Sequence, residues 1–426
     1  MNILIKDTNL LQSDGNALYN TSVFIEDTII KSIGAIPADF IADKTIDGSG
    51  YITMPGLVNA HTHSPMTLLR NIGDDLPFRE WLFDSIIPLE GRLSSEDIYY
   101  GSLLGILEMI RSGVTCFCDM YFHTDSIAAA ISESGIRAHI SYGLINAAVR
   151  GTAESVDVEG YETFLERWHN KGNITTGIEV HSVYLYEKQT IVQAADIAKS
   201  LDSRIHIHLA ETASEVTDCY KKYSMSPVEL AASAGVFDCP TIAAHCTILS
   251  DKDIQLLKQY EVNVVHCPSS NLKLACGVAP VTKMLDAGIN VTLGTDSAAS
   301  NNNLNMFEEM HLAALLHKCT QKDPTLLDAA TIVEMATSNG AKAAGFNNTG
   351  ELIEGKLADV IMIDMSKPHM NPPGNLASSL IYSAQASDVD TVIVGGTILM
   401  EKGQISFIDQ QEVIAKVKEI RNRILF

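Results

Sequence analysis

Histidine and carboxylate side chains gather in four short segments of this chain, each at or just beyond the end of an apolar run. The segments are His61-Thr62-His63, His208-Leu209-Ala210-Glu211, His245 and Gly294-Thr295-Asp296. Side chains alternate along a strand, so His61 and His63, two residues apart, point to one face. Three imidazoles and one carboxylate suit zinc, with one coordination position left for water. The segments together predict a metal centre, provided that the fold brings them to one place.

Strand-like and helix-like segments alternate through the middle of the chain. Eight strands are predicted at residues 56–60, 114–119, 137–142, 175–181, 204–209, 241–245, 263–266 and 290–294. Helical patterns lie between them and after the last strand, at 99–111, 125–134, 161–170, 190–200, 227–234, 251–260, 282–287, 305–318 and 328–343. This order predicts an α/β fold, a (β/α)8 TIM barrel, whose active site lies at the carboxyl ends of the strands. The candidate ligands fall at those ends.

Further strand signals occupy both ends of the chain. They lie at 2–5, 22–26 and 29–33 before the barrel and at 360–364, 392–394 and 397–400 after it. We expect a small β-sandwich domain built from both chain termini and flanking the barrel. The predicted division is 1–54 for its N-terminal part, 55–347 for the barrel, 348–408 for its C-terminal part and 409–426 for a final helix.

The amino-acid composition argues against several classes of protein. The 426 residues are 46% hydrophobic, which is enough for a large core, and 30 basic against 52 acidic residues give a formal charge of −22. Such a balance argues against binding nucleic acid or anionic membranes. Lys6 and Asp7 interrupt the first apolar residues too early for a signal peptide. Eight cysteines without a framework spacing indicate reduced thiols, so we expect a cytoplasmic protein.

Longer motifs make the chain resemble the amidohydrolase superfamily, in particular its deaminase and chlorohydrolase branch. Residues 55–63, Pro-Gly-Leu-Val-Asn-Ala-His-Thr-His, resemble the first-strand signature of the superfamily, and residues 350–360 resemble the return into its small β domain. Within the branch, residues 65–70, 270–274 and 294–302 are most similar to the 5′-methylthioadenosine/S-adenosylhomocysteine deaminases. The resemblance runs nearly end to end, and it implies a homo-oligomer.

The expected metal ligands are His61, His63, His208 and Asp296. His206 and His208 share one strand face, so spacing alone does not choose between them, but His208 with Glu211 matches the HxxE motif of the family. The predicted strand 175–181 holds no lysine, so the carbamylated-lysine bridge of binuclear relatives is missing. We therefore expect one Zn²⁺, with Fe²⁺ or Mn²⁺ as alternatives.

Such a centre predicts hydrolytic deamination. A bound ion lowers the pKa of water, and Asp296 is placed to take the proton. Glu211 would transfer a proton to a ring nitrogen. By resemblance, His245 orients or stabilises the attacking oxygen. The expected reaction converts the 6-amino group of an adenosine derivative to the inosine analogue and releases ammonia.

The resemblance also implies substrate contacts at Glu90, His181, Trp81 and Arg150. Glu90 would accept hydrogen bonds from the ribose hydroxyls, His181 would contact the ring or ribose, and Trp81 would wall the pocket. Tyr142 stands where some members carry an arginine for a carboxylate tail, and Arg150 is the candidate for a second such arginine. We therefore expect small 5′ groups, as in methylthioadenosine, adenosine or 5′-deoxyadenosine, and keep S-adenosylhomocysteine as a candidate.

Two other functions stay open. A sibling enzyme with the same metal ligands could act on guanine, a pterin or an s-triazine, although the combination of Glu90, Trp81 and His181 favours a nucleoside. A metal-binding protein without catalysis is disfavoured because the catalytic set, which includes Glu211 and His245, is complete. His266 is assigned equally to the pocket wall and to the buried core.

Overall fold

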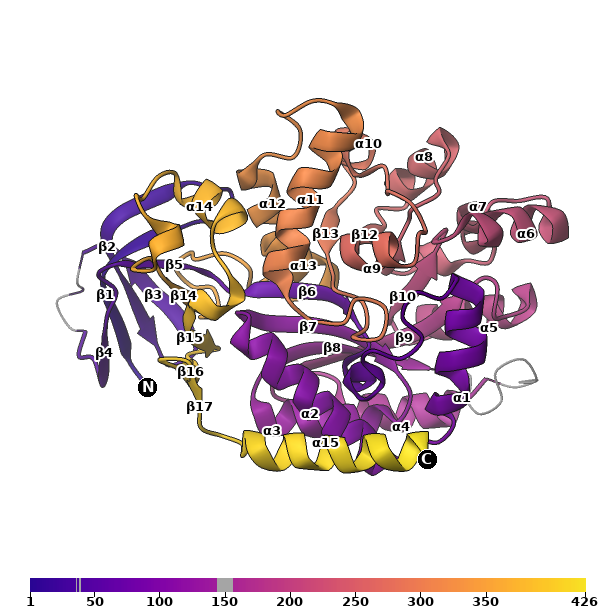
Figure 1. Ribbon diagram of the computed structural model, residues 1–426, viewed down its shortest axis with the longest axis horizontal. Coiled ribbons are helices and arrows are strands. Elements are labelled where there is room, and N and C mark those ends of the chain that lie inside the picture. The colour runs from indigo at the N-terminus through magenta and orange to yellow at the C-terminus, as the bar shows by residue number, and fades with distance from the viewer. Residues whose placement is uncertain (36, 38–39, 144–155) are drawn as a thin grey trace.

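The computed structural model describes residues 1–35, 37, 40–143 and 156–426 (Figure 1). Eight strands pair in chain order, each parallel to the next, into one sheet. They are β6 (Leu57–Thr62), β7 (Val114–Tyr121), β8 (Arg137–Gly143), β9 (Ile174–Ser182), β10 (Arg204–Leu209), β11 (Thr241–His245), β12 (Asn263–His266) and β13 (Val291–Leu293). A bridge between Thr62 and Asp296 brings the two edges of this sheet together. The predicted (β/α)8 barrel is confirmed.

Helices between successive strands cover the outside of the barrel (Figure 1). Those that precede β13 are α1 (Ile87–Glu90), α2 (Ser95–Arg111), α3 (Thr124–Ser134), α4 (Val158–Trp168), α5 (Lys188–Ser200), α6 (Ala213–Tyr223), α7 (Pro227–Ser233), α8 (Asp251–Gln259), α9 (Pro268–Lys273) and α10 (Val281–Asp286). The later ones are α11 (Met306–Gln321), α12 (Ala329–Ala336), α13 (Ser338–Ala344), α14 (Leu376–Tyr382) and α15 (Gln410–Leu425). The sequence patterns did not predict α1, α6, α9 or α14.

One predicted helix is wrong in its extent. The segment 328–343 forms two helices, α12 and α13, because the backbone at Thr337 leaves the helical region with φ −129° and ψ −93°. Gly340 allows α13 to lie close to the barrel, since a Cβ atom there would lie 2.7 Å from Cβ of Val58 on β6. Close packing against the barrel therefore overrides the continuous helical pattern.

The second sheet is built from both ends of the chain, as predicted, and contains nine strands where six were predicted (Figure 1). The strands are β1 (Ile3–Leu11), β2 (Ala17–Glu26), β3 (Ile29–Ile33), β4 (Lys44–Asp47), β5 (Tyr51–Pro55), β14 (Val360–Asp364), β15 (Val389–Val394), β16 (Thr397–Glu401) and β17 (Gln404–Ile405). The N-terminal half of β1 pairs with β4, and its C-terminal end pairs with β5. The antiparallel pairing of β5 with β14 joins the two chain ends. The domain boundaries predicted above stay a proposal.

A buried ion pair connects the two sheets. Nε and Nη2 of Arg137, on β8, donate to the two carboxylate oxygens of Asp359 at 2.8 and 3.0 Å. The backbone N–H of Gly395 donates to the same carboxylate at 2.7 Å. Both charged side chains are almost fully buried, at 4% and 2% exposure. Bidentate geometry and the additional donor satisfy the carboxylate in this apolar setting.

Among the described residues, no helix combines the length and apolar character needed to cross a bilayer. All eight cysteines lie in the described part of the chain and are free, and of these only Cys319 is exposed.

Candidate metal centre and active site

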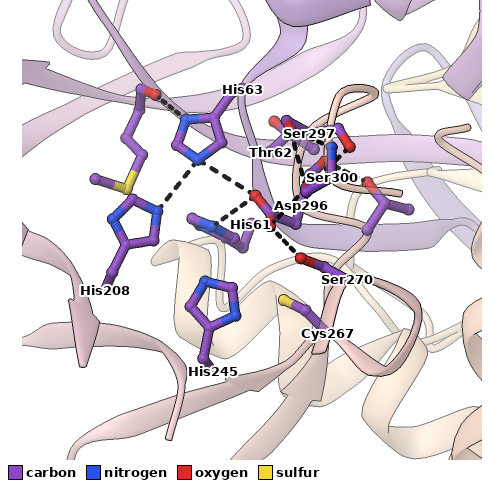
Figure 2. A network of polar contacts seen from close by, with 12 residues as sticks. His61, Thr62, His63, His208, His245, Cys267, Ser270, Asp296, Ser297 and Ser300 are labelled. Carbon is purple, nitrogen blue, oxygen red and sulfur yellow. Dashed lines mark hydrogen bonds and ion pairs between the residues drawn. The ribbon is translucent and has the colours of Figure 1, made fainter. Parts of the chain in front are cut away.

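Four side chains from three places on the barrel meet at the carboxyl end of its strands (Figure 2). His61 is in β6, His63 directly follows it, and His208 is in β10. Asp296 follows β13 and is held beside β6 by its backbone N–H, which donates to the carbonyl of His61 at 3.0 Å. One ligand atom from each of the four side chains lies within 4.8 Å of all the others. The predicted ligands therefore form one buried cluster.

Hydrogen bonds at Nδ1 orient each imidazole ring. Nδ1 of His63 donates to the carbonyl of Met120 at 2.5 Å, and Nδ1 of His208 donates to the carbonyl of His181 at 2.8 Å. Nδ1 of His61 lies 2.9 Å from Nε2 of His206. With Nδ1 engaged in this way, each Nε2 atom is available to a metal ion.

The donor atoms left in the cluster fit a cation. The Nε2 atoms of His63 and His208 are 3.2 Å apart, and in neutral rings that donate through Nδ1 both atoms carry lone pairs. Nε2 of His61 is buried and has no hydrogen-bond partner in the structure. Both His61 and His63 place Nε2 3.4 Å from Oδ1 of Asp296. Three nitrogens and one oxygen facing a common point match a zinc-type site with one position left for water.

Two hydroxyl groups orient the carboxylate of Asp296. Oδ2 of Asp296 accepts hydrogen bonds from Ser270 Oγ at 2.6 Å and from Ser300 Oγ at 2.8 Å (Figure 2). These donors occupy Oδ2 and leave Oδ1 directed at the histidines. The two donors that orient this carboxylate thus come from α9 and from the loop after β13.

Burial and neighbouring charges shift the pKa values of the clustered side chains in opposite directions. Burial alone would raise the pKa of Asp296, but the neighbouring His61 and His63, each with Nε2 3.4 Å from Oδ1, hold it well below its usual value. Burial also lowers the pKa of His61 to about 4. For His63 the burial effect is outweighed by the hydrogen bond and charge of Asp296, which raise its pKa to about 9. An ionised Asp296 therefore attracts positive charge into this site.

Glu211 and His245 stand beside the cluster. Nδ1 of His245 lies 3.0 Å from the Oδ1 atom of Asn271, and its Nε2 lies 3.8 Å from Oε1 of Glu211. Burial raises the pKa of Glu211, and the charge of Asp296 raises it further, whereas His245 acts in the opposite direction. The predicted proton-transfer group and the predicted oxygen-stabilising group are thus neighbours.

The backbone at this end of the barrel is unusual. Ala210, His245, Cys246 and Asp296 have φ values of 49°, 73°, 47° and 60°. Residues other than glycine rarely adopt this left-handed region, and each such residue costs about 1–3 kcal/mol. Three of the four loops that carry site residues therefore contain conformations that the surrounding structure must hold in place.

A cavity of about 520 Å³, open to solvent, lies over the cluster. Its apolar lining consists of Met66, Phe78, Trp81, Leu82, Ile86, Met120, Tyr121 and Tyr184. Its polar lining consists of His63, Glu90, Glu179, His181, His208, Glu211, His245, Asp296 and Ser297. A π-helical segment, η2 (Glu80–Ile86), and the adjoining α1 provide Trp81 and Glu90. The mixed apolar and polar lining suits a small organic ligand.

Three of the four predicted substrate contacts line this cavity, namely Glu90, Trp81 and His181. The indole N–H of Trp81 is buried without a hydrogen-bond partner in the structure. The fourth, Arg150, lies outside the described residues.

Two further residues considered from the sequence lie away from the described cavity wall. The hydroxyl of Tyr142 donates to Asp157 at 2.7 Å, and this tyrosine is not part of the cavity lining. His266 is buried, with Nε2 3.4 Å from Nε2 of His317, and is likewise absent from the lining.

Sequence reasoning missed several residues of the site. Glu179 lines the cavity from β9, two residues before His181 on the same strand face. That spacing was a signal that could have found it. The contact of His206 with the ligand His61, 2.9 Å between Nε2 and Nδ1, was not predicted. Phe78 and Tyr121 carried no motif that distinguishes a cavity wall from ordinary core.

Fold and cluster together define a barrel enzyme with a metal-binding centre at the carboxyl ends of its strands. The model of the amidohydrolase family matches residues 52–399. The chain is 49% identical over 435 residues to the 5-methylthioadenosine/S-adenosylhomocysteine deaminase of Acetivibrio thermocellus, covering 100% of both chains. It is 45% identical to the enzyme of the same name from Thermoanaerobacter pseudethanolicus, covering 98% of both. The chain belongs to the amidohydrolase family.

Solved structures agree with this assignment. An adenosine deaminase from Xanthomonas campestris with bound zinc superposes with a TM-score of 0.93 and 34% identity, covering 99% of this chain and 98% of that one. An atrazine chlorohydrolase from Arthrobacter aurescens, complexed with zinc, superposes with a TM-score of 0.91 over 98% of this chain and 100% of its own. Its identity is 23%, so that likeness concerns the fold alone.

Proposed function

We propose that this protein is a zinc-dependent deaminase of adenosine derivatives, a hydrolase that acts on C–N bonds of cyclic amidines. The observation that carries the proposal is the single ligand cluster, His61, His63, His208 and Asp296, at the base of a cavity whose wall holds Glu211 and His245. Relatives named as deaminases of such substrates, at 45–49% identity over 98–100% of the chain, support it.

The cluster would hold one ion. The described strand β9 contains no lysine that could bridge two metals, which supports a mononuclear site. Bound there, a divalent ion supplies a Lewis acid that lowers the pKa of water to near neutral. Asp296 would take the proton of the attacking water. Zinc is proposed, with Fe²⁺ and Mn²⁺ as alternatives, because neutral imidazole and carboxylate ligands accept all three.

Glu211 is the proposed proton shuttle. Water attack on the amine-bearing carbon puts negative charge on the ring unless the neighbouring ring nitrogen gains a proton. The raised pKa of the buried Glu211 carboxyl helps it to hold the proton that it gives to the ring nitrogen, where that proton stays in the product. The proton that Asp296 takes from water would pass to the leaving amine, and Glu211 would regain a proton from the attacking oxygen as the intermediate collapses. His245, 3.8 Å from Glu211, orients the attacking oxygen. Loss of ammonia then leaves the inosine analogue.

The cavity walls support a nucleoside. Glu90 is proposed to accept hydrogen bonds from the ribose hydroxyls, while Trp81 covers one side of the ligand and offers its unused N–H. His181 is proposed to contact the ring or ribose. None of the described residues that line the cavity is a lysine or arginine. A carboxylate tail would therefore depend on Arg150, and we rank small 5′ groups first.

Ammonia release tests the proposal. The zinc-loaded protein is assayed with adenosine, 5′-methylthioadenosine, 5′-deoxyadenosine, S-adenosylhomocysteine, guanine and an s-triazine, with chelator-treated protein as the control. We expect turnover of the adenosine derivatives, dependent on the metal, with the small 5′ groups ahead of S-adenosylhomocysteine.

Other outcomes of this assay are equally informative. Turnover of guanine or the triazine alone would keep the metal chemistry and overturn the proposed pocket roles. S-adenosylhomocysteine as the best substrate, with its advantage lost in Arg150→Met, would reverse the ranking of 5′ groups. No turnover by the zinc-bound protein would favour a binding function without catalysis.

A further inference from the structure

Glu215 is a buried carboxylate that the proposed chemistry does not use. It lies in the first turn of α6, with 5% of its surface exposed, and it is not part of the cavity lining. Oε1 accepts the backbone N–H of Ala210 at 3.1 Å, and Oε2 accepts the backbone N–H of Glu211 at 2.7 Å. Two consecutive N–H groups just before the helix are therefore held by one side chain.

The turn that Glu215 holds is conformationally costly. Ala210 has a φ of 49°, in the left-handed region that alanine avoids. From the other side, the carbonyl of Ala210 accepts hydrogen bonds from the backbone N–H groups of Thr247 at 3.0 Å and Ile248 at 2.9 Å. The peptide units between β10 and α6 are thus clamped by Glu215 on one side and by the loop after β11 on the other.

This turn connects two parts of the site. It begins immediately after the ligand His208 and ends at Glu211, whose carboxylate lies 3.8 Å from Nε2 of His245. Because Glu215 accepts the backbone N–H of Glu211, the clamp fixes the position of the Glu211 backbone and thereby the direction of its side chain. We infer that Glu215 is a positioning residue that holds the 209–211 turn so that the Glu211 carboxylate faces the reacting ring. This inference rests on the proposed shuttle role of Glu211.

The clamp differs from ordinary helix capping. Thr212 is the N-cap of α6, and its Oγ1 accepts the backbone N–H of Glu215 at 3.1 Å. The Glu215 carboxylate reaches past that cap, to Glu211 and Ala210. Thr212→Ala therefore weakens the same helix by about 1 kcal/mol and removes neither of the Glu215 oxygens that accept the N–H groups of Ala210 and Glu211. It is the matched control for a purely structural role.

The test compares Glu215→Gln, Glu215→Ala and Thr212→Ala in the zinc-loaded protein. Hydrogen exchange of the 205–215 segment measures the clamp without any substrate, and kcat and KM for the best adenosine derivative measure its effect on turnover. We expect faster exchange at Ala210 and Glu211 in both Glu215 variants. We also expect kcat to fall by roughly 10- to 100-fold, because a misplacement of about 1 Å has that effect. KM and zinc content should change little.

The outcomes separate the possible failures. Thr212→Ala should lower the melting temperature and keep kcat close to that of the parent protein. Unchanged exchange in Glu215→Gln, or a kcat no lower than that of Thr212→Ala, would overturn the positioning role. If Glu215→Ala does not fold, Glu215→Gln decides, since it keeps the volume and loses one acceptor. No turnover by the parent protein would overturn the proposed function alone, because the exchange measurement uses no substrate.

Discussion

At the scale of the residue, the metal-binding role and the proton-transfer role belong to different side chains and can be tested separately. Glu211 lies beside the metal cluster but is not one of the four grouped ligands, whereas His61 is one of them. A change at Glu211 should therefore affect chemistry, and a change at His61 should affect metal binding. This separation is what distinguishes a catalytic carboxylate from one that only completes the charge of a buried site.

Glu211→Gln is expected to keep zinc and lose turnover. Glutamine preserves the shape of the side chain but cannot carry a proton between water and the ring, so kcat should fall by about 10²- to 10⁴-fold. Zinc content by metal analysis and kcat by ammonia release check this directly. His61→Ala is the contrasting variant and should lose zinc as well. Near-normal turnover in Glu211→Gln would remove the shuttle role.

At the scale of the element, buried acids hold the loops that carry the site. Glu309 on α11 accepts the backbone N–H of Ser269 at 3.1 Å and the Nδ2 group of Asn301 at 2.8 Å. It therefore ties α11 to α9 and to the loop after β13. Those two segments provide Ser270 and Ser300, the two donors to Asp296.

Glu309 should make stability depend on pH. Burial raises its pKa from 4.5 to about 7 in the folded protein. The folded state then binds a proton more tightly than the unfolded chain does. The stabilising contribution is complete below about pH 4.5 and is lost as pH rises through about 7. Urea unfolding between pH 5 and 8 should show the parent protein losing stability relative to Glu309→Gln. A difference that does not change with pH would contradict this assignment.

At the scale of the whole molecule, the barrel and the terminal sheet are joined by Arg137 and Asp359. Desolvation makes such a pair a weak source of net stability, but removal of one partner leaves an unpaired buried charge. The helix α15 adds a second connection, since it leaves the terminal sheet and packs along α2 of the barrel (Figure 1). Both connections are made by the C-terminal part of the chain.

Arg137→Met is expected to destabilise the protein by about 3–5 kcal/mol. Urea unfolding gives this value, and Arg137→Met/Asp359→Leu should recover much of it, because neither charge then remains buried. Arg167→Met removes the exposed pair with Asp125 and serves as the control, with an expected loss of at most about 1 kcal/mol. Additive losses in the double variant would show that the two residues act independently.

The fold and most of the ligand set could be predicted because they depend on short-range periodicity. Alternation along one strand is enough to place His61 and His63 on the same face, and it also placed His206 and His208 together. Periodicity predicts the strand face on which a side chain lies, but it does not predict the position of that side chain along the barrel axis. The choice of His208 over His206 rested on the HxxE motif, and the structure places His208 in the cluster with Asp296 and His206 against His61.

The remaining features depend on contacts between segments far apart in the chain. The bridge between Thr62 and Asp296 that brings the barrel edges together, the clamp of Glu215 on a left-handed Ala210 and the break between α12 and α13 carry no local pattern. Each is the result of packing and hydrogen bonding that outweigh intrinsic backbone preference. The sequence by itself therefore determined the barrel, the terminal sheet and the chemistry of the ligands. The tertiary structure decided which atoms face the reacting centre, because strand register and loop packing set their final positions.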